Sequence, residues 1–268
     1  MKTKLLIILG ILLIVGWTVF WLYDYNKDGA TKKGGDLYQT IVKRGYMIVG
    51  VKTDVKPFGF INEKGENAGF DIDIARNIAK DILHDESKVK FVPTTDSDRF
   101  YQLNLGKVDM VIATMTVTPT RQHFADFSNA YYITGQALLV RNGSNIRSLG
   151  DLSNKNVGVI FGSTAEETIK FLLPTAHVMG YKTYKEAYNA LKAGHILGIT
   201  SDEAILRNFS LNDSGVKILP KRYSRDSYAI AFRRGEESNY ILEIVNNAIS
   251  DMDNKGIFNQ LKRKWGLI

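Results

Sequence analysis

The chain has 268 residues, 44% hydrophobic and 24% charged, with a formal net charge of +7. This describes a globular protein of one large or two medium domains. The absence of cysteine excludes disulfides, thiolate metal sites and a lipid-modified N-terminal cysteine, and a mild excess of bases without an Arg/Lys stripe argues against nucleic-acid binding.

The N-terminal segment is the most apolar part of the chain. Residues 5–23 contain no acid or base, Lys2 and Lys4 precede them, and aromatic residues gather at their far end. This pattern predicts a membrane-spanning helix with a cytoplasmic N-terminus. The alternative is a cleaved signal peptide, whose apolar core is usually shorter and ends at small residues. We therefore predict an anchor or signal segment over residues 1–24, a polar linker over residues 25–35, and export of the remainder.

Helices and strands alternate through the next part of the chain. Hydrophobic periodicity predicts helices at 36–44, 71–83 and 96–105, strands at 46–51, 89–92 and 110–113, and a small hairpin around 63–65. Strands that alternate with helices in this way imply a parallel α/β sheet.

A second α/β set follows Asn142 and Gly143. A strand is predicted at 137–140, before these two residues. After them the predicted strands are 157–161, 197–200 and 228–232, and the predicted helices are 165–172, 184–193, one that opens at Asp202, and 237–254. Two such sets indicate two lobes, with a ligand cleft between them at the C-terminal ends of strands.

The segment from Val108 to Ser128 combines a buried strand, a hydroxyl-rich turn and the start of a helix. Thr118 is a suitable N-cap, Pro119 suits the first helical turn, and Arg121 follows just inside. Free backbone N–H groups, hydroxyl donors and a guanidinium together suit a carboxylate. The alternative interpretation is a surface arginine on a short helix.

The run TMTVTPTRQ, followed by Asp126, Phe127 and Ser128, resembles the signature of the polar amino-acid-binding proteins of bacterial ABC importers. The resemblance extends over most of residues 36–268. It implies an α/β, two-lobed type II periplasmic-binding-protein fold, here preceded by the N-terminal membrane helix, with two hinge crossings near 131–135 and 224–228. The implied lobes are residues 36–133 with 226–268, and residues 134–225.

The resemblance also implies how the backbone of a free L-amino acid is held. Arg121 and Thr116 match the clamp for the α-carboxylate, and Asp202 matches the acid that takes the α-ammonium. Thr114 falls where relatives use a backbone contact to the ligand. The alternative for Asp202 is a plain helix N-cap.

Specificity is expected from groups around the ligand side chain. Lys52 and Arg99 follow strands on the cleft side of the first lobe, and in aspartate-binding relatives both matching positions can be basic. Tyr184 matches a further ligand contact, while Ser163 and Thr164 begin a helix whose N–H groups favour an anion. Two extra cations suit a second carboxylate, which predicts aspartate or glutamate as the ligand. Glutamine, asparagine or another polar amino acid is the alternative, and both cations could instead be solvated surface charges.

The sequence shows no catalytic signature and no metal-ligand spacing among its four histidines. We therefore expect no enzyme activity and no cofactor. The predicted protein is a monomer outside the cytoplasmic membrane that closes on an amino acid and delivers it to an ABC permease. Two alternatives are a dehydratase of prephenate-like substrates, with Glu166 or Glu167 as general acid, and a sensor lobe that signals to a membrane partner.

Overall fold

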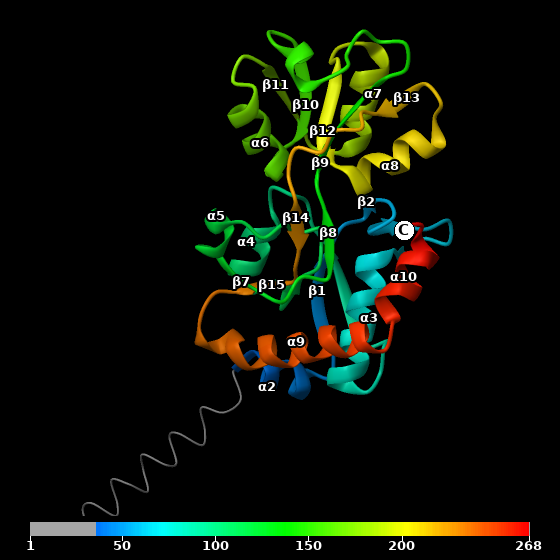
Figure 1. The fold of residues 1–268 in the computed structure, drawn as a ribbon. Helices are drawn as coiled ribbons and strands as arrows, with labels where there is room; N and C mark the ends of the chain where they lie inside the picture. The colour runs from blue at the N-terminus through cyan, green and yellow to red at the C-terminus, as the bar shows by residue number, and fades with distance from the viewer. Residues whose placement is uncertain (1–35, 268) are drawn as a thin grey trace, which may run out of the picture.

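The computed structural model of the protein describes residues 36–267, which form two lobes joined by a pair of antiparallel strands (Figure 1). The predicted anchor at 1–24 and the linker at 25–35 lie outside the described residues. Between residues 36 and 267, no helix is both long enough and apolar enough to cross a membrane.

The first lobe is built on a five-stranded mixed sheet, in which the N-terminal strands run parallel and the returning C-terminal strand runs antiparallel to both of its neighbours. In spatial order the strands are β5 (Val89–Pro93), β1 (Met47–Val51), β6 (Met110–Val111), β15 (Ala231–Arg233) and β7 (Ala125–Phe127). The predicted parallel arrangement of β5, β1 and β6 is confirmed, but the sheet as a whole is mixed because β15 returns antiparallel.

A small sheet and six helices complete the first lobe. The small sheet contains the predicted hairpin and consists of β2 (Asp54–Val55), β3 (Gly59–Ile61) and β4 (Asn67–Ala68). The helices are α2 (Asp36–Arg44), α3 (Phe70–Leu83), α4 (Arg99–Asn104), α5 (Pro119–Gln122), α9 (Asn239–Asn254, after the 3₁₀ turn Glu236–Ser238) and α10 (Ile257–Trp265).

The C-terminal helices pack against α3, as Figure 1 shows in red and cyan. The predicted inward face of α3, which includes Ile72 and Ile78, is fully buried. Asp73 on the same helix accepts hydrogen bonds from Lys264 Nζ at 2.7 Å and Trp265 Nε1 at 2.8 Å. These bonds fasten α10, a helix that the sequence pattern did not predict.

The second lobe has its own five-stranded mixed sheet with three helices and one 3₁₀ turn (Leu149–Leu152). Its strands, in spatial order, are β11 (His177–Tyr181), β10 (Asn156–Ile160), β12 (Gly198–Asp202), β9 (Gln136–Arg141) and β13 (Val216–Ile218). Its helices are α6 (Thr164–Leu172), α7 (Tyr184–Ala193) and α8 (Glu203–Asn212).

The lobes are joined through β8 (Tyr132–Thr134) and β14 (Asp226–Tyr228), which pair antiparallel. These strands lie within the two segments that were expected to cross. The predicted strand 228–232 is divided between β14 and β15, because Ala229 N–H donates to the carbonyl of Met115 instead of continuing either strand ladder.

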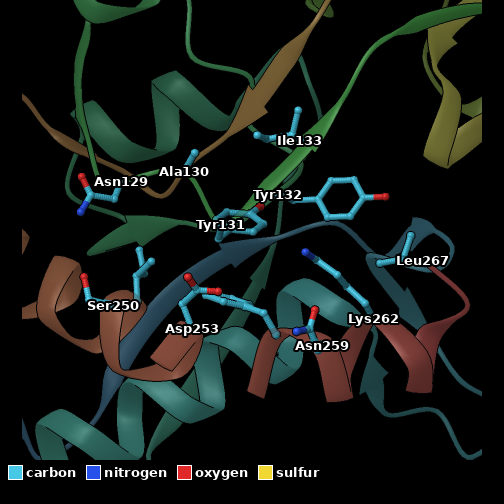
Figure 2. Close-up of a pocket in the computed structure, with 12 residues that line it drawn as sticks. Asn129, Ala130, Tyr131, Tyr132, Ile133, Ser250, Asp253, Asn259, Lys262 and Leu267 are labelled. Atoms are coloured by element: carbon cyan, nitrogen blue, oxygen red, sulfur yellow. The ribbon is translucent and has the colours of Figure 1, made fainter. Parts of the chain in front are cut away.

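A hollow of about 540 Å³ lies beside β8, between residues 129–133 and the helices α9 and α10 (Figure 2). None of the predicted ligand residues lines it. It is therefore distinct from the predicted ligand site.

Candidate functional site

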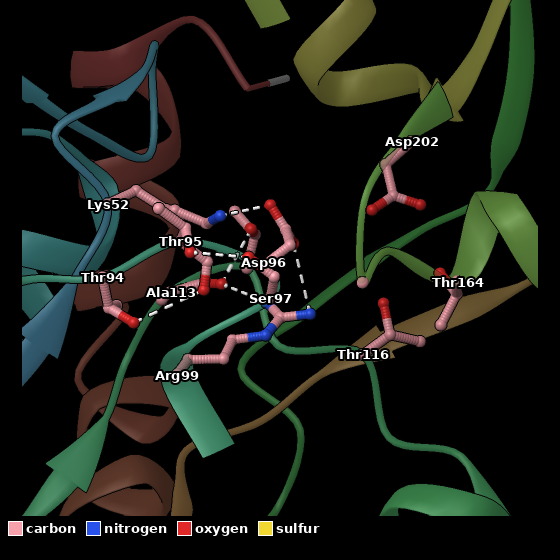
Figure 3. Close-up of polar contacts among 12 residues, drawn as sticks. Lys52, Thr94, Thr95, Asp96, Ser97, Arg99, Ala113, Thr116, Thr164 and Asp202 are labelled. Atoms are coloured by element: carbon pink, nitrogen blue, oxygen red, sulfur yellow. Dashed lines mark hydrogen bonds and ion pairs between the residues drawn. The ribbon is translucent and has the colours of Figure 1, made fainter. Parts of the chain in front are cut away.

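The cleft side of the first lobe holds a buried cluster of two bases and one acid. Lys52 follows β1, Arg99 begins α4, and Asp96 lies in the turn between β5 and α4. Lys52 Nζ donates a hydrogen bond to Asp96 Oδ2, and Arg99 Nη2 lies 3.2 Å from Asp96 Oδ1 (Figure 3). The two cations that were predicted to bind a ligand carboxylate therefore already share a protein carboxylate.

This arrangement depends on where α4 begins. The helix was predicted from residue 96, but it starts at Arg99, after a turn over residues 96–98. Asp98 holds that turn by accepting hydrogen bonds from Thr95 N at 2.8 Å and Thr94 Oγ1 at 2.8 Å. The later start leaves Asp96 outside the helix, where its side chain reaches both cations.

Ion pairing opposes the effect of burial within this cluster. Burial alone would raise the pKa of Asp96, but Lys52 and Arg99 outweigh burial and hold that pKa below its ordinary value. Burial lowers the pKa of Lys52, and Asp96 opposes this effect. With one acid and two bases the cluster carries a net charge of +1.

Arg121 donates hydrogen bonds to a carbonyl group of each lobe. Its Nη1 donates to Thr116 O at 2.9 Å, and Nη2 donates to Gly162 O of the second lobe at 3.1 Å. The predicted Thr118 N-cap is confirmed, because its hydroxyl accepts from Arg121 N at 3.1 Å. Burial, with Arg99 nearby, lowers the pKa of Arg121 to about 9. No carboxylate of residues 36–267 forms an ion pair with this guanidinium, so an anion would be stabilised beside it.

Asp202 is the matching buried acid of the second lobe. It stands before α8, but its carboxylate does not cap the helix. It instead accepts hydrogen bonds from Tyr228 Oη at 2.5 Å and Gln136 Nε2 at 3.1 Å. Burial raises its pKa to about 7. Because no cation in the described part of the chain pairs with it, an ammonium group would relieve the cost of its buried charge.

The remaining predicted residues surround these two charges. Thr164 Oγ1 accepts from Gln136 Nε2 at 3.2 Å, and Tyr184 Oη lies 2.8 Å from Ser201 Oγ. Ser163 Oγ is buried without a hydrogen-bond partner, as is Gln136 Oε1. These two orphaned atoms are available to a ligand. In Figure 3, Thr116 and Thr164 lie near one another, and no dashed line joins either of them or Asp202 to the Lys52–Asp96–Arg99 cluster.

Thr114 takes part through its backbone. Its hydroxyl donates to the neighbouring carbonyl of Ala113 at 2.8 Å, and its φ of 47° lies in the left-handed region. Its side chain is therefore committed locally.

The lobes touch at Gly162, which has a φ of 77°. A Cβ atom at this position would lie 2.7 Å from Asp96 O and 2.9 Å from Ser97 Cα, both in the first lobe. Such distances are too short for a side chain, so closure of the lobes requires glycine here.

Sequence reasoning missed Asp96, Gln136 and Tyr228 as site residues. An acid three positions before Arg99, and a glutamine at the start of the apolar run QALLV, were the available signals. Nothing local to Tyr228 distinguishes it from a core tyrosine, because its contact with Asp202 joins positions that are 26 residues apart.

Comparison with known proteins gives consistent matches. The family model described as bacterial extracellular solute-binding proteins, family 3, matches residues 47–268. The glutamine-binding protein GlnH of an ABC transporter of Bacillus subtilis is 35% identical over 242 residues, which are 90% of this chain and 88% of that protein. The glutamine-binding protein of Geobacillus stearothermophilus is 39% identical over 226 residues, 83% of this chain and 86% of that protein.

A similar solved structure is an ancestral arginine-binding protein bound to glutamine. It is 39% identical, with a TM-score of 0.76, over 83% of this chain and 98% of that chain.

Replacing Gly162 with alanine should weaken ligand binding by holding the lobes apart. We expect about a tenfold or greater loss of affinity for an amino-acid ligand in isothermal titration calorimetry of the full chain in mild detergent. Gly143→Ala is the matched control, because Gly143 has the same φ but no atom near its missing Cβ. Both variants should lose about 1 kcal/mol of stability, and equal affinities in the two would contradict the steric argument.

Binding should weaken as the pH falls through 7. Below that pH Asp202 is protonated in the unliganded protein, so an ammonium ligand must displace a proton, and affinity for an amino acid should fall by up to about tenfold per pH unit. Asp202→Asn should bind weakly at every pH and abolish this dependence. A wild-type affinity that is constant from pH 8 to pH 5 would contradict the assignment.

The same substitution should stabilise the unliganded protein at pH 8. The folded-state pKa of Asp202 is raised, so its stabilising contribution is complete below pH 4 and is lost as the pH rises through about 7. Asp202→Asn should therefore unfold at a higher temperature than wild type at pH 8. The gain in unfolding free energy should be up to about 4 kcal/mol at pH 8 and should shrink towards pH 5. Exposed Asp251→Asn is the control.

Proposed function

Because this chain belongs to family 3 of the bacterial extracellular solute-binding proteins, which serve polar amino acids, we propose that it binds an amino acid with a carboxamide side chain, glutamine first. The protein closes its lobes on this ligand and delivers it to an ABC permease. The observation that carries the proposal is the position of Asp96 between Lys52 and Arg99.

Recognition of the ligand backbone follows from two uncompensated charges on opposite lobes. Arg121 in the first lobe offers a guanidinium to the α-carboxylate, with Thr116 beside it. Asp202 in the second lobe offers a carboxylate to the α-ammonium, with Gln136 Oε1 as a further acceptor. A zwitterion supplies one charge of each sign, so it satisfies both partners only when the lobes are closed.

Recognition of the side chain follows from the mixed cluster. A carboxamide has an N–H₂ group, which suits an oxygen of Asp96, and a carbonyl, which suits the N–H donors of Lys52 or Arg99. Arg99 Nε is buried without an acceptor. A ligand carboxylate would add a second negative charge beside Asp96. The sequence-based preference for an acidic ligand assumed two free cations, so the pairing with Asp96 favours the alternative, glutamine or asparagine.

The similar proteins support the same choice. Two relatives are named for glutamine binding, and the compared structure holds glutamine. An acidic amino acid remains the second candidate, because the cluster retains a net positive charge. Both candidates are polar amino acids, the class of ligand that the family serves.

A binding role without catalysis agrees with the family. Glu166, one of the two candidate general acids, is half-buried on α6 and is paired with Lys170 at 2.8 Å. Glu167, the other candidate, is exposed. Within residues 36–267 neither forms a hydrogen bond that would hold it over a ligand, so the dehydratase alternative gains no support.

Calorimetry of the full chain in mild detergent against the twenty amino acids tests the proposal. Glutamine should bind about tenfold or more tightly than glutamate. Arg121→Ala should weaken every ligand, because losing one partner of a desolvated charge pair costs roughly 2–5 kcal/mol, or about 30- to 4,000-fold in Kd. Exposed Arg147→Ala is the matched control. Tightest binding of glutamate would favour the second candidate, and no binding of any amino acid would contradict the function.

Substitutions within the cluster should change the preference for glutamine over glutamate. Asp96→Asn removes the acid and leaves two cations, so the ratio of glutamine to glutamate affinity should fall by about tenfold or more, since hydrogen bonds to charged groups contribute roughly 1.5–3 kcal/mol. Lys52→Gln removes one cation and should raise the same ratio. Ratios that do not change in either folded variant would remove the cluster from the specificity site.

A further inference from the structure

We propose that Asp71 is a positioning residue of the ligand site, which fixes the segment 113–117 and ties it to the first hinge crossing. We call this segment the binding loop. Asp71 is fully buried in the first turn of α3. The inference rests on the proposed function, because it assigns a second task to the same site.

The carboxylate of Asp71 holds two groups that are far apart in the sequence. Oδ2 accepts from the backbone N–H of Thr114 at 2.9 Å, and Oδ1 accepts from Tyr131 Oη at 3.1 Å. Thr114 has a φ of 47°, a conformation unfavourable for a residue with a branched Cβ. The hydrogen bond from its N–H thus helps to hold the loop in a shape that threonine does not prefer.

The binding loop in turn orients both arginines of the site. The carbonyl of Ala113 accepts from Arg99 Nη1 at 2.9 Å, and the carbonyl of Thr116 accepts from Arg121 Nη1 at 2.9 Å. A rotation of the Thr114 peptide would displace the Ala113 carbonyl directly, because the two belong to one planar unit. Asp71 therefore acts on the ligand through the loop rather than by contact.

Both crossings meet at this loop. Tyr131 begins the first crossing and is bound by Asp71. On the second crossing, Ser227 O accepts from Val117 N at 2.9 Å, and Ala229 N donates to Met115 O at 3.0 Å. The loop thus shares hydrogen bonds with ligand-binding groups and directly with the second crossing, and it is linked to the first crossing through Asp71.

The burial of Asp71 argues for such a role. A buried carboxylate without a paired cation is costly. No ion pair joins Asp71 to a base within residues 36–267, whereas Asp73, two positions along the same helix, is paired with Lys264 and Arg76. Asp73 holds α10, away from the loop. Substituting Asp73 should therefore affect stability alone, whereas substituting Asp71 should also affect the position of the loop.

The test compares Asp71→Leu, Asp71→Asn and Asp73→Leu in the full chain in mild detergent. Leucine keeps the branching at Cγ, with somewhat larger volume, and removes both acceptors. Asparagine keeps an oxygen for the Thr114 N–H and an N–H₂ group for the Tyr131 hydroxyl. We expect Asp71→Leu to weaken glutamine binding by about tenfold or more, and Asp71→Asn to stay within about threefold of wild type. Asp73→Leu should unfold at a lower temperature and keep its affinity.

Amide hydrogen exchange supplies a readout that needs no ligand. Peptides covering residues 110–117 should exchange about tenfold faster in Asp71→Leu than in wild type, and at the wild-type rate in Asp73→Leu. If wild type does not bind glutamine, the proposed ligand is wrong. The exchange measurement still tests the role of Asp71 in that case. Unchanged exchange in folded Asp71→Leu would overturn the inference. A loss of glutamine affinity in Asp71→Asn as large as in Asp71→Leu would also overturn it.

Should Asp71→Leu not fold, Tyr131→Phe carries the test, because it removes a single hydroxyl from the hydrogen-bonded set. We expect faster exchange in residues 110–117 of that variant, by about threefold or more. An exchange rate equal to that of wild type would overturn the link between the loop and the hinge.

Discussion

The site depends on a buried acid that lies between two bases. Burying the charges of Lys52, Asp96 and Arg99 carries a large desolvation cost, and their mutual attraction offsets it only because the contacts are close. The same turn that carries Asp96 also receives Gly162 of the second lobe. The cluster therefore both shapes the side-chain end of the cleft and forms the surface on which the lobes meet.

The second organising feature is the separation of the unpaired charges. Arg121 and Asp202 belong to different lobes, and each is buried without an oppositely charged partner in residues 36–267. Closure without a ligand leaves the charges of Arg121 and Asp202 buried and uncompensated, at a cost in free energy. A zwitterion compensates both charges at once. A ligand shifts a conformational equilibrium only through such a difference in interaction energy between the two states. In the unliganded protein, this cost opposes full closure.

Much of the fold could be predicted from local patterns, and the site only in part. The inward face of α3 and the N-cap at Thr118 were readable because each is set by neighbours three or four residues away. The mixed strand order could not be predicted in this way, since β15 comes from the far end of the chain and lies between β6 and β7. Lys52 and Arg99 were found, but Asp96 changes their meaning. It does so through contact with Lys52 across 44 residues, which no local spacing encodes.

A crystal structure of the full chain with glutamine tests the central claim most directly. The account predicts a closed cleft in which the ligand carboxylate contacts Arg121, its ammonium contacts Asp202, and its side-chain amide lies against Asp96 with the bonds to Lys52 and Arg99 retained. A ligand whose side chain avoids the cluster, or an Asp96 that has swung away from both bases, would contradict it.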